Sequence, residues 1–280
     1  HDDDREDGAT GSGEAERPTG MIPCPIHDGA IGDIVAIQSM FLRGPYRLVP
    51  RDPKLSETEY QFSNWYHFRW LSGDDVSQSL VHNLDRMRWV LREQNPTWCF
   101  GLGGRSTSFG EVFGDMFDNH SVVYEFADGP RLYALCQTRS GCYGNWDDII
   151  MGTKGVCHWS ACKIEGETNW HYTGPRNNSS AEEQKILIGS IRDGKPVNHG
   201  DTMIDSTYVG IMGQIACYTG KRVTWDQMMA ADFEFEPKLA DVTLEFTDVG
   251  ITEMYPRDLP DIFYGSQMVV AGRYRGGGPT

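Results

Sequence analysis

The sequence predicts an α+β fold in which antiparallel strands and a few helices form packed layers. Residues 122–126 and 132–137 are strand-like runs that flank Ala-Asp-Gly-Pro, a hairpin signal. Residues 70–91 and 202–218 repeat apolar side chains at helical spacing. Because strands follow one another in the middle of the chain instead of alternating with helices, a doubly wound parallel sheet is not expected.

Turn signals place the other strands. Residues 33–41 form a strand that leaves a turn with two glycines, ahead of the hairpin. Residues 155–164 and 168–172 are expected to form another antiparallel pair, joined near Gly166. The strands therefore favour a largely antiparallel sheet.

The segment 202–218 carries signals for both ends of a helix. Thr202 and Asp205 suit an N-terminal capping pair. Gly220 stops the helix, and Lys221 lies near its negative end.

The other helix, within residues 70–91, has two opposite faces. One is polar and carries Gln78, His82, Asp85 and Trp89, and it can present a titratable imidazole to a cleft. The alternative is a solvated surface, against which Trp89 argues, because a large outward aromatic ring is usually covered. The apolar face consists of Val76, Leu80, Leu84, Met87 and Leu91.

Residues 73–85 read G-D-x-x-x-Q-x-x-x-H-N-L-D. This run resembles the G-D-x-x-x-E-x-x-x-H-N-L-D signature of the Gfo/Idh/MocA family of NAD(P)-dependent oxidoreductases. The order and spacing of further segments support the resemblance: I-H-D-G-A-I-G-D-I-V (26–35), N-W-Y-H-F-R-W-L-S-G-D (64–74), G-L-G-G-R (101–105), V-V-Y-E-F-A-D-G (122–129), G-T-K-G (152–155), N-H-G-D-T-M-I-D-S-T (198–207) and T-G-K-R-V-T-W-D-Q-M (219–228).

The resemblance implies an open, mainly antiparallel β-sheet with helices on one face. It also implies a homo-oligomer formed through the other sheet face, and NAD or NADP as cofactor. Family members carry a Rossmann domain before the segment that starts here at Ile26, whereas residues 1–25 show no strand and no G-x-G-x-x-G. Residues 101–104 lack the third spaced glycine and are interpreted as a turn after a short strand. We therefore expect a substrate domain without its cofactor domain, so that nucleotide binding by this chain alone is not expected.

Three parts are expected along the chain: a disordered acidic and Gly-rich segment (1–25), the oxidoreductase C-terminal domain (26–235) and a β-rich tail (236–280). Within the tail, residues 239–276 resemble the region after the von Willebrand factor A-type module in inter-alpha-trypsin-inhibitor-heavy-chain-like bacterial proteins. A join between unrelated fragments is the working hypothesis, which pairing of residues 242–247 into the central sheet would contradict.

The resemblance assigns the catalytic histidine to His82, the type of base that a sugar hydroxyl requires near neutral pH. Asp85, one turn on, orients that imidazole, pairs with Arg86 or Arg88, or is a surface carboxylate; these alternatives stay open. Gln78 departs from the family, which has an acid there, and an amide cannot raise imidazole basicity as a carboxylate does.

Aromatic faces and forked donors suit carbohydrate rings. On this ground the candidate substrate contacts are Tyr66, His67, Arg105, Trp146, Asn198 and His199, although each alone also suits a structural role.

Composition bounds the partners. The net charge of −15 excludes a nucleic-acid surface, because backbone phosphates require a basic patch. No apolar run of about 18 residues and no signal-peptide pattern occur, so a soluble protein is expected, in the cytoplasm or the periplasm. The seven cysteines form no C-x-x-C pair, which argues against a disulfide framework. Zinc is not expected either, because Cys157 and Cys162 would lie on opposite faces of one strand.

Two function classes follow. One is a sugar or cyclitol oxidoreductase whose nucleotide domain lies elsewhere; the other is a non-catalytic carbohydrate-binding or assembly module. A third possibility, an adhesion-type module whose function depends on residues 236–280, is the least favoured of the three, because the metal-binding half of such modules is not recognised in the sequence.

Overall fold

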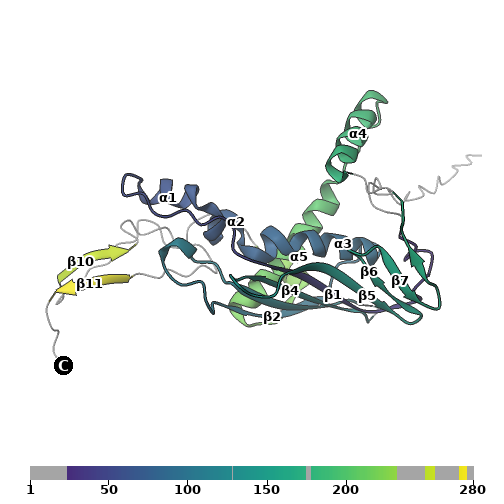
Figure 1. The fold of residues 1–280 in the computed structure, drawn as a ribbon, viewed down its shortest axis with the longest axis horizontal. Helices are drawn as coiled ribbons and strands as arrows, with labels where there is room; N and C mark the ends of the chain where they lie inside the picture. Colours follow the sequence, from purple (N-terminus) through teal and green to yellow (C-terminus); the bar gives the residue numbers. More distant parts are fainter. Residues whose placement is uncertain (1–23, 128, 175–177, 232–249, 256–270, 276–280) are drawn as a thin grey trace, which may run out of the picture.

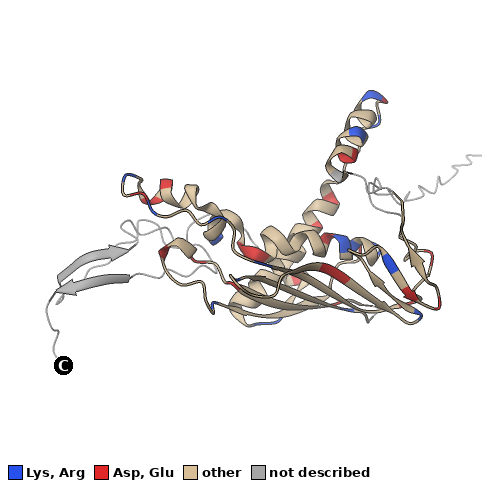
Figure 2. Cartoon of the chain, in the orientation of Figure 1, with Lys and Arg blue, Asp and Glu red and all other residues tan. Residues whose placement is uncertain are grey.

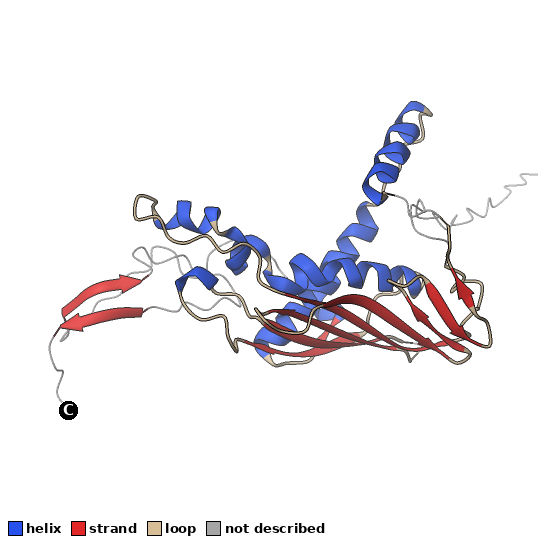
Figure 3. Ribbon diagram, in the orientation of Figure 1, coloured by secondary structure: helices blue, strands red, loops and turns tan. Residues whose placement is uncertain are grey.

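A computed structural model describes residues 24–127, 129–174, 178–231, 250–255 and 271–275. Its largest unit is a nine-stranded sheet in the order β8-β7-β6-β5-β1-β4-β3-β2-β9. Helices lie along one side of this sheet (Figures 1 and 3). Among the described strands, β1 and β4 pair in parallel and the other neighbours are antiparallel. The prediction of an open, mainly antiparallel sheet with helices on one face is confirmed.

The strands of this sheet are β1 (Ile34–Arg43), β2 (Trp98–Gly104), β3 (Asn119–Glu125), β4 (Arg131–Thr138), β5 (Asn145–Gly152), β6 (Gly155–His158), β7 (Lys163–Gly166), β8 (Trp170–His171) and β9 (Val223–Thr224). The α-helices are α1 (Glu57–Ser63), α2 (Arg69–Ser72), α3 (Val81–Val90), α4 (Ser179–Arg192), α5 (Gly200–Thr219) and α6 (Trp225–Met229). Two short 3₁₀ turns are η1 (Trp65–His67) and η3 (Glu111–Phe113), and η2 (Val76–Leu80) is a π-helical turn that runs into α3.

Strand register concentrates the core on the helix side of the sheet. Seven neighbouring strands place one residue each in a single row, and every member is at most 1% exposed. Alternation along the strands puts the next residue of each on the other face. The row is Cys99, Tyr124, Leu132, Ile37, Ile150, Cys157 and Ile164.

The opposite face of the sheet is open. Phe100, Leu102 and Tyr133 are 43%, 72% and 39% exposed on it. Figure 2 shows that the sheet carries few charged residues, whereas acidic and basic residues intermix on α4. No described helix is long and apolar enough to cross a membrane.

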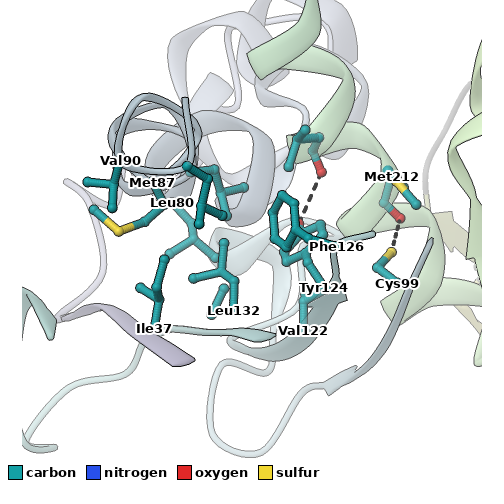
Figure 4. Packing of buried hydrophobic residues seen from close by; sticks show 14 of the residues in the cluster. Ile37, Leu80, Met87, Val90, Cys99, Val122, Tyr124, Phe126, Leu132 and Met212 are labelled. Atoms are coloured by element: carbon teal, nitrogen blue, oxygen red, sulfur yellow. Dashed lines mark hydrogen bonds between the residues drawn. The ribbon is translucent and has the colours of Figure 1, made fainter. Parts of the chain in front are cut away.

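The single helix predicted within residues 70–91 is interrupted: α2 ends at Ser72, Gly73 and Asp74 take left-handed φ values of +77° and +65°, and the helix resumes at Val76. Its predicted apolar stripe is confirmed, because all five members are buried against the sheet. Figure 4 shows Leu80 and Met87 of this stripe facing Ile37 and Leu132 of the sheet. At about 25 cal/mol per Å² of buried apolar area, such a stripe fixes the rotation of the helix and therefore which side chains point outward.

The helix α5 packs unusually close to β2 and β3 because glycines occupy the contact. A Cβ on Gly101 would lie 2.7 Å from Cys217 Sγ, and one on Gly213 would lie 2.0 Å from the Tyr124 hydroxyl. That hydroxyl donates to the Val209 carbonyl at 3.0 Å, and Cys99 Sγ bonds to the Met212 carbonyl at 3.5 Å (Figure 4). The predicted turn at residues 101–104 is therefore wrong: these residues belong to β2, and Gly101 and Gly103 lie against Cys217 of α5.

Two other predictions about local structure need correction. Residues 155–164 form two strands, β6 and β7, because the chain reverses after Trp159 with Cys162 at φ +50°. Thr202 and Asp205 lie inside α5, which begins at Gly200, where the Asn198 side chain accepts the Gly200 amide at 2.9 Å. Sequence reasoning failed at the first site because no Gly or Pro marks the turn.

The other strand, hairpin and helix-end predictions are confirmed. Residues 33–41 lie almost wholly in β1, and β3 and β4 pair across a turn containing Gly129. Gly220 ends α5 in the left-handed conformation at φ +64°.

In the tail, β10 (Gly250–Tyr255) and β11 (Ala271–Arg275) form a separate two-stranded antiparallel sheet. Residues 242–247 and the predicted acidic segment before Cys24 lie outside the described residues.

The close contact of α5 generates a test. Substituting Gly213→Ala should destabilise the chain by about 1–3 kcal/mol through overpacking against Tyr124. This would occur although alanine favours a helix interior over glycine by about 1 kcal/mol. Gly189→Ala in α4 is the matched control, because its Cβ meets nothing within 4 Å. Urea unfolding measures both, and equal stability of the two variants would contradict the packing account.

Candidate functional site

His82 lies on the outward face of α3, where the buried stripe holds the opposite side of the helix against the sheet. Its imidazole is exposed to solvent. The next residue, Asn83, is fully buried and points to the end of the sheet formed by β1 and β5. The helix thus carries an exposed imidazole immediately beside a buried polar anchor.

That anchor is a network around Asp148, which is fully buried on β5. Asn83 Nδ2 donates to Asp148 Oδ1 at 2.8 Å, and Arg86 Nη2 donates to Asp148 Oδ2 at 2.7 Å. Burial raises the pKa of Asp148, and the charge of Arg86 opposes that rise. The Trp146 indole donates to Asn83 Oδ1 at 3.1 Å while 56% of this residue stays exposed. The network therefore fixes an exposed aromatic ring beside the helix segment that carries His82.

Further rings extend this region, which we call the outer α3 surface (His82, Arg86, Trp89, Trp146 and Trp159). The Arg86 guanidinium lies 5.8 Å from the Trp146 ring and 6.0 Å from the Trp159 ring. Trp89 meets Trp159 edge-on at 6.0 Å. A surface with three indoles, one guanidinium and one imidazole suits a ligand with both C–H faces and polar groups.

Tyr66 belongs to a second group, built on the first turn of the same helix. Its ring stacks on Tyr46 at 4.1 Å, and the Arg43 guanidinium covers the other side of Tyr46 at 3.2 Å. Arg43 Nη2 donates to Asp75 Oδ1 at 2.8 Å, and the Tyr46 hydroxyl bonds with Ser79 Oγ at 2.9 Å. These contacts tie the stacked rings to the helix that carries His82.

His67 lies beside this group, with only 6% of its surface exposed. Its Nε2 has no hydrogen-bond partner among the described residues. Burial is the largest effect on His67 and lowers its pKa, which favours the neutral imidazole. It lines a pocket of about 280 Å³, part of it open to solvent, and so could offer a donor or an acceptor there. The other lining residues are Pro45, Tyr46, Ser108, Phe113, Met116, Phe117, Asp118 and Thr138.

Arg105 shapes the loop beside that pocket. Its guanidinium donates to the carbonyls of Met116 at 2.7 Å and Phe113 at 2.9 Å, and to that of Gly114. Asp118 accepts the Ser108 amide at 2.9 Å together with the two preceding amides, and these bonds outweigh burial and lower its pKa. The Arg105 guanidinium thus donates to backbone carbonyls and holds this loop in place.

The remaining sequence candidates lie apart from these two groups. The amide of Gln78 is buried, without a hydrogen-bond partner among the described residues. Asp85 accepts a hydrogen bond from Ser206 Oγ of α5 at 2.7 Å. Asn198 and His199 are exposed between the start of α5 and α4, which projects away from the sheet (Figure 1). The structure thus places Trp146 beside the His82 segment and groups Tyr66, His67 and Arg105, but no contact joins Asn198 or His199 to either group.

Sequence reasoning missed the junction beneath the helix. Asp74 and His120 are buried, with Asp74 Oδ2 3.3 Å from His120 Nε2. The Tyr218 hydroxyl of α5 donates to the same carboxylate oxygen. Burial alone would raise the pKa of Asp74 and lower that of His120, but their mutual attraction prevails, so the first is lowered and the second raised. The only sequence signal was the position of Asp74 inside the 73–85 motif.

Neither a metal nor a dinucleotide finds a matching site here. The described part of the chain holds no group of three or more His, Cys, Asp or Glu side chains arranged for a metal ion. A pyrophosphate requires a glycine-rich turn that opens a helix. The glycine-rich run of this chain lies instead within β2, with Gly101 and Gly103 closed against Cys217. The described residues therefore do not fit the nucleotide phosphates.

Comparison with protein families matches residues 25–206 to "Oxidoreductase family, C-terminal alpha/beta domain". Comparison with curated proteins gives no match. The match does not reach residues 239–276, and nothing found supports their similarity to inter-alpha-trypsin-inhibitor-like proteins.

Similar solved structures include a putative oxidoreductase from Thermotoga maritima (TM-score 0.54, 15% identity, 71% of this chain and 57% of that one). Others are an aldose-aldose oxidoreductase from Caulobacter crescentus complexed with glycerol (0.54, 16%, 71% and 58%) and a putative myo-inositol dehydrogenase from Sinorhizobium meliloti (0.51, 16%, 71% and 59%). These likenesses show the fold, and the chain spans less than two-thirds of the length of each structure.

The buried junction makes stability depend on pH. The pKa of His120 is raised above its ordinary 6.5 on folding, so its contribution is full below 6.5 and is lost as pH rises through the folded value. The pKa of Asp74 is lowered below 3.8, so its contribution is present above 3.8 and is lost as pH falls through the folded value. We expect the pair to stabilise most between these limits.

Urea unfolding from pH 3 to 9 measures this dependence, at steps of about one pH unit. Asp74→Asn should lower the free energy of unfolding by about 3–5 kcal/mol near pH 5 and flatten both slopes. His171→Gln, on the exposed edge strand β8, is the control and should leave the curve unchanged. An Asp74→Asn curve parallel to that of the unmodified chain would refute the assignment.

Proposed function

This chain belongs to the Gfo/Idh/MocA oxidoreductase family, whose C-terminal alpha/beta domain matches residues 25–206, and we propose that it forms the substrate-binding half of an NAD(P)-dependent oxidoreductase acting on sugars or cyclitols. In this proposal residues 26–235 are the substrate domain. The outer α3 surface faces the substrate, and the nicotinamide cofactor is not assigned to any described residue.

The observation that carries the proposal is the ring of Trp146, which is hydrogen-bonded to Asn83, the residue next to the exposed His82. Saturated sugar and cyclitol rings present C–H faces that pack on indoles, while their hydroxyls need hydrogen-bonding partners. The Asp148 network holds both Asn83 and Arg86, so the ring does not have to be ordered when substrate binds. Such preorganisation lowers the entropic cost of binding.

In the proposed mechanism His82 accepts the proton of the substrate hydroxyl as its carbon is oxidised. A solvent-exposed imidazole can reach the substrate hydroxyl and is the type of base that this step requires. Gln78 stands where the family has an acid, and an uncharged amide does not raise imidazole basicity. We therefore expect slower proton transfer here than with a carboxylate at position 78.

NAD or NADP, when bound, supplies the hydride acceptor of this chemistry. The glycine-rich run of the described residues offers no room for the cofactor phosphates, since Gly101 and Gly103 pack against Cys217. Hydride transfer is therefore not assigned to any described side chain. What these residues are proposed to do is bind the ring, orient one hydroxyl and take its proton.

The second candidate function is an assembly module that acts through the open sheet face. It is favoured by one observation: Phe100, Leu102 and Tyr133 leave large apolar side chains in solvent on that face. Contiguous apolar surface of this kind commonly marks a protein interface. A homo-oligomer formed through this face is compatible with substrate binding on the helix side.

Sugar binding tests the first candidate. Isothermal titration of the chain with myo-inositol and a panel of aldoses should give saturable binding. Trp146→Ala should weaken it about three- to tenfold, the worth of one aromatic packing contact. Trp70→Ala is the matched control, because Trp70 is 58% exposed on another part of the chain and should leave binding unchanged.

Equal losses for the two tryptophan variants, or no saturable binding by any sugar or cyclitol, would reject the carbohydrate site. A parallel titration with NAD(H) and NADP(H), followed by tryptophan fluorescence, separates the function classes. Micromolar binding of either nucleotide would rule out a purely non-catalytic module.

The assembly candidate is tested by charge. Leu102→Glu places a carboxylate among the exposed apolar side chains of this face and should shift the species seen by light scattering toward the monomer, because burying that charge costs several kcal/mol. Leu187→Glu on α4, where Leu187 is 44% exposed, is the control and should not change the mass. A chain that is monomeric before any substitution would refute assembly through this face.

A further inference from the structure

Two cysteines far apart in the sequence meet on the helix side of the sheet. Cys24 Sγ lies 3.8 Å from Cys157 Sγ, across 133 residues of chain. Cys157 is 1% exposed in the middle of the core row, on β6, whereas Cys24 is half-buried. Neither thiol takes part in the proposed function. Nothing in the sequence indicated this pair, because the seven cysteines form no recognisable disulfide pattern.

We propose that Cys24 and Cys157 are a redox site, forming a reversible disulfide that fastens the segment before β1 to β6. This inference does not rest on the proposed function. The two sulfurs are already in van der Waals contact, and a disulfide brings them to about 2.05 Å. Cys24 lies at the start of a run of turns that reaches Gly32, so this side of the bond can adjust without moving a strand.

The two thiols have different environments, which sets the direction of the reaction. Their mutual hydrogen bond lowers the pKa of Cys24 and raises that of Cys157, and burial raises Cys157 further. Thiolates are the nucleophiles in disulfide exchange. Cys24, half-buried and the more acidic, is therefore the attacking residue, and the buried Cys157 is the resolving one.

The oxidant is a low-molecular-weight disulfide such as oxidised glutathione. The Cys24 thiolate attacks one sulfur of that disulfide, which forms a mixed disulfide and releases one glutathione thiolate. Cys157 then loses its proton and attacks Cys24 Sγ, which releases the second glutathione thiolate. The protein loses two electrons and two protons, and the oxidant becomes two thiols.

The bond would act on a segment that touches the outer α3 surface. His27 Nε2 bonds to the Val90 carbonyl at 3.2 Å, and its ring lies 4.4 Å from that of Trp89. Trp159, two residues beyond Cys157, also contacts Trp89, with ring centroids 6.0 Å apart. Oxidation would join these two segments covalently, at a point where a thiol–thiol hydrogen bond and packing now hold them.

The test oxidises the full chain with glutathione, traps remaining thiols with iodoacetamide in denaturant, and maps tryptic peptides by mass spectrometry. We expect a loss of two hydrogens and a crosslink between the peptides of Cys24 and Cys157. The tryptic peptide of Cys157 also contains Cys162, so Cys162→Ser is the matched control and must keep the crosslink. Cys142→Ser removes the exposed thiol and must keep it as well.

Cys157→Ser should abolish the crosslink and leave glutathione on Cys24. The oxidised chain should also unfold with a Tm about 5–10 °C above that of the reduced chain, a shift that Cys157→Ser removes. Seven alkylated thiols after oxidation, a crosslink to Cys162 in place of Cys157, or a crosslink that survives Cys157→Ser would overturn the assignment.

Discussion

The buried junction of Asp74, His120 and Tyr218 is the contact on which the arrangement of the site depends. It joins three segments that are remote in sequence: Asp74 in the short connection between α2 and η2, strand β3, and the end of α5. A carboxylate without exposed surface is costly unless it is paired, so losing any partner leaves an uncompensated charge in the core. Because η2, which runs into the helix that carries His82, begins two residues after Asp74, this junction fixes where the helix starts, and the apolar stripe fixes its rotation.

The sheet supplies the other half of the site. The parallel pair β1 and β4 ends where Arg43 and Thr138 lie side by side, and the helix-side positions near this end hold Trp146 and His120 instead of aliphatic side chains. Core packing elsewhere on this face is continuous. The polar groups that sugar chemistry requires are therefore confined to one end of an otherwise apolar layer, and the glycines of β2 let α5 close the layer at the far strands.

Much of this could be inferred from sequence where the signal is local. Periodicity identified the stripe from Val76 to Leu91, and the motif placed His82 on an outward face. Contacts between residues far apart in the sequence carried no such signal. Nothing in the sequence around Asp148 indicates that it bonds to Asn83, and nothing around His120 indicates that it pairs with Asp74. Gly101 was misinterpreted because a glycine that admits a helix looks the same as a glycine in a turn. The turn between β6 and β7 was missed because Cys162 adopts a left-handed conformation that its residue type rarely takes.

Binding of a sugar or cyclitol to the outer α3 surface at His82 can be followed by nuclear magnetic resonance of the chain with ¹³C-labelled histidine and ¹⁵N-labelled tryptophan. On addition of myo-inositol or a bound aldose, we expect the His82 imidazole and Trp146 indole signals to move together and saturate at one ligand concentration, while the Trp70 indole signal stays unchanged. Saturating shifts confined to other residues, with the His82 and Trp146 signals unmoved, would show that the ligand binds elsewhere.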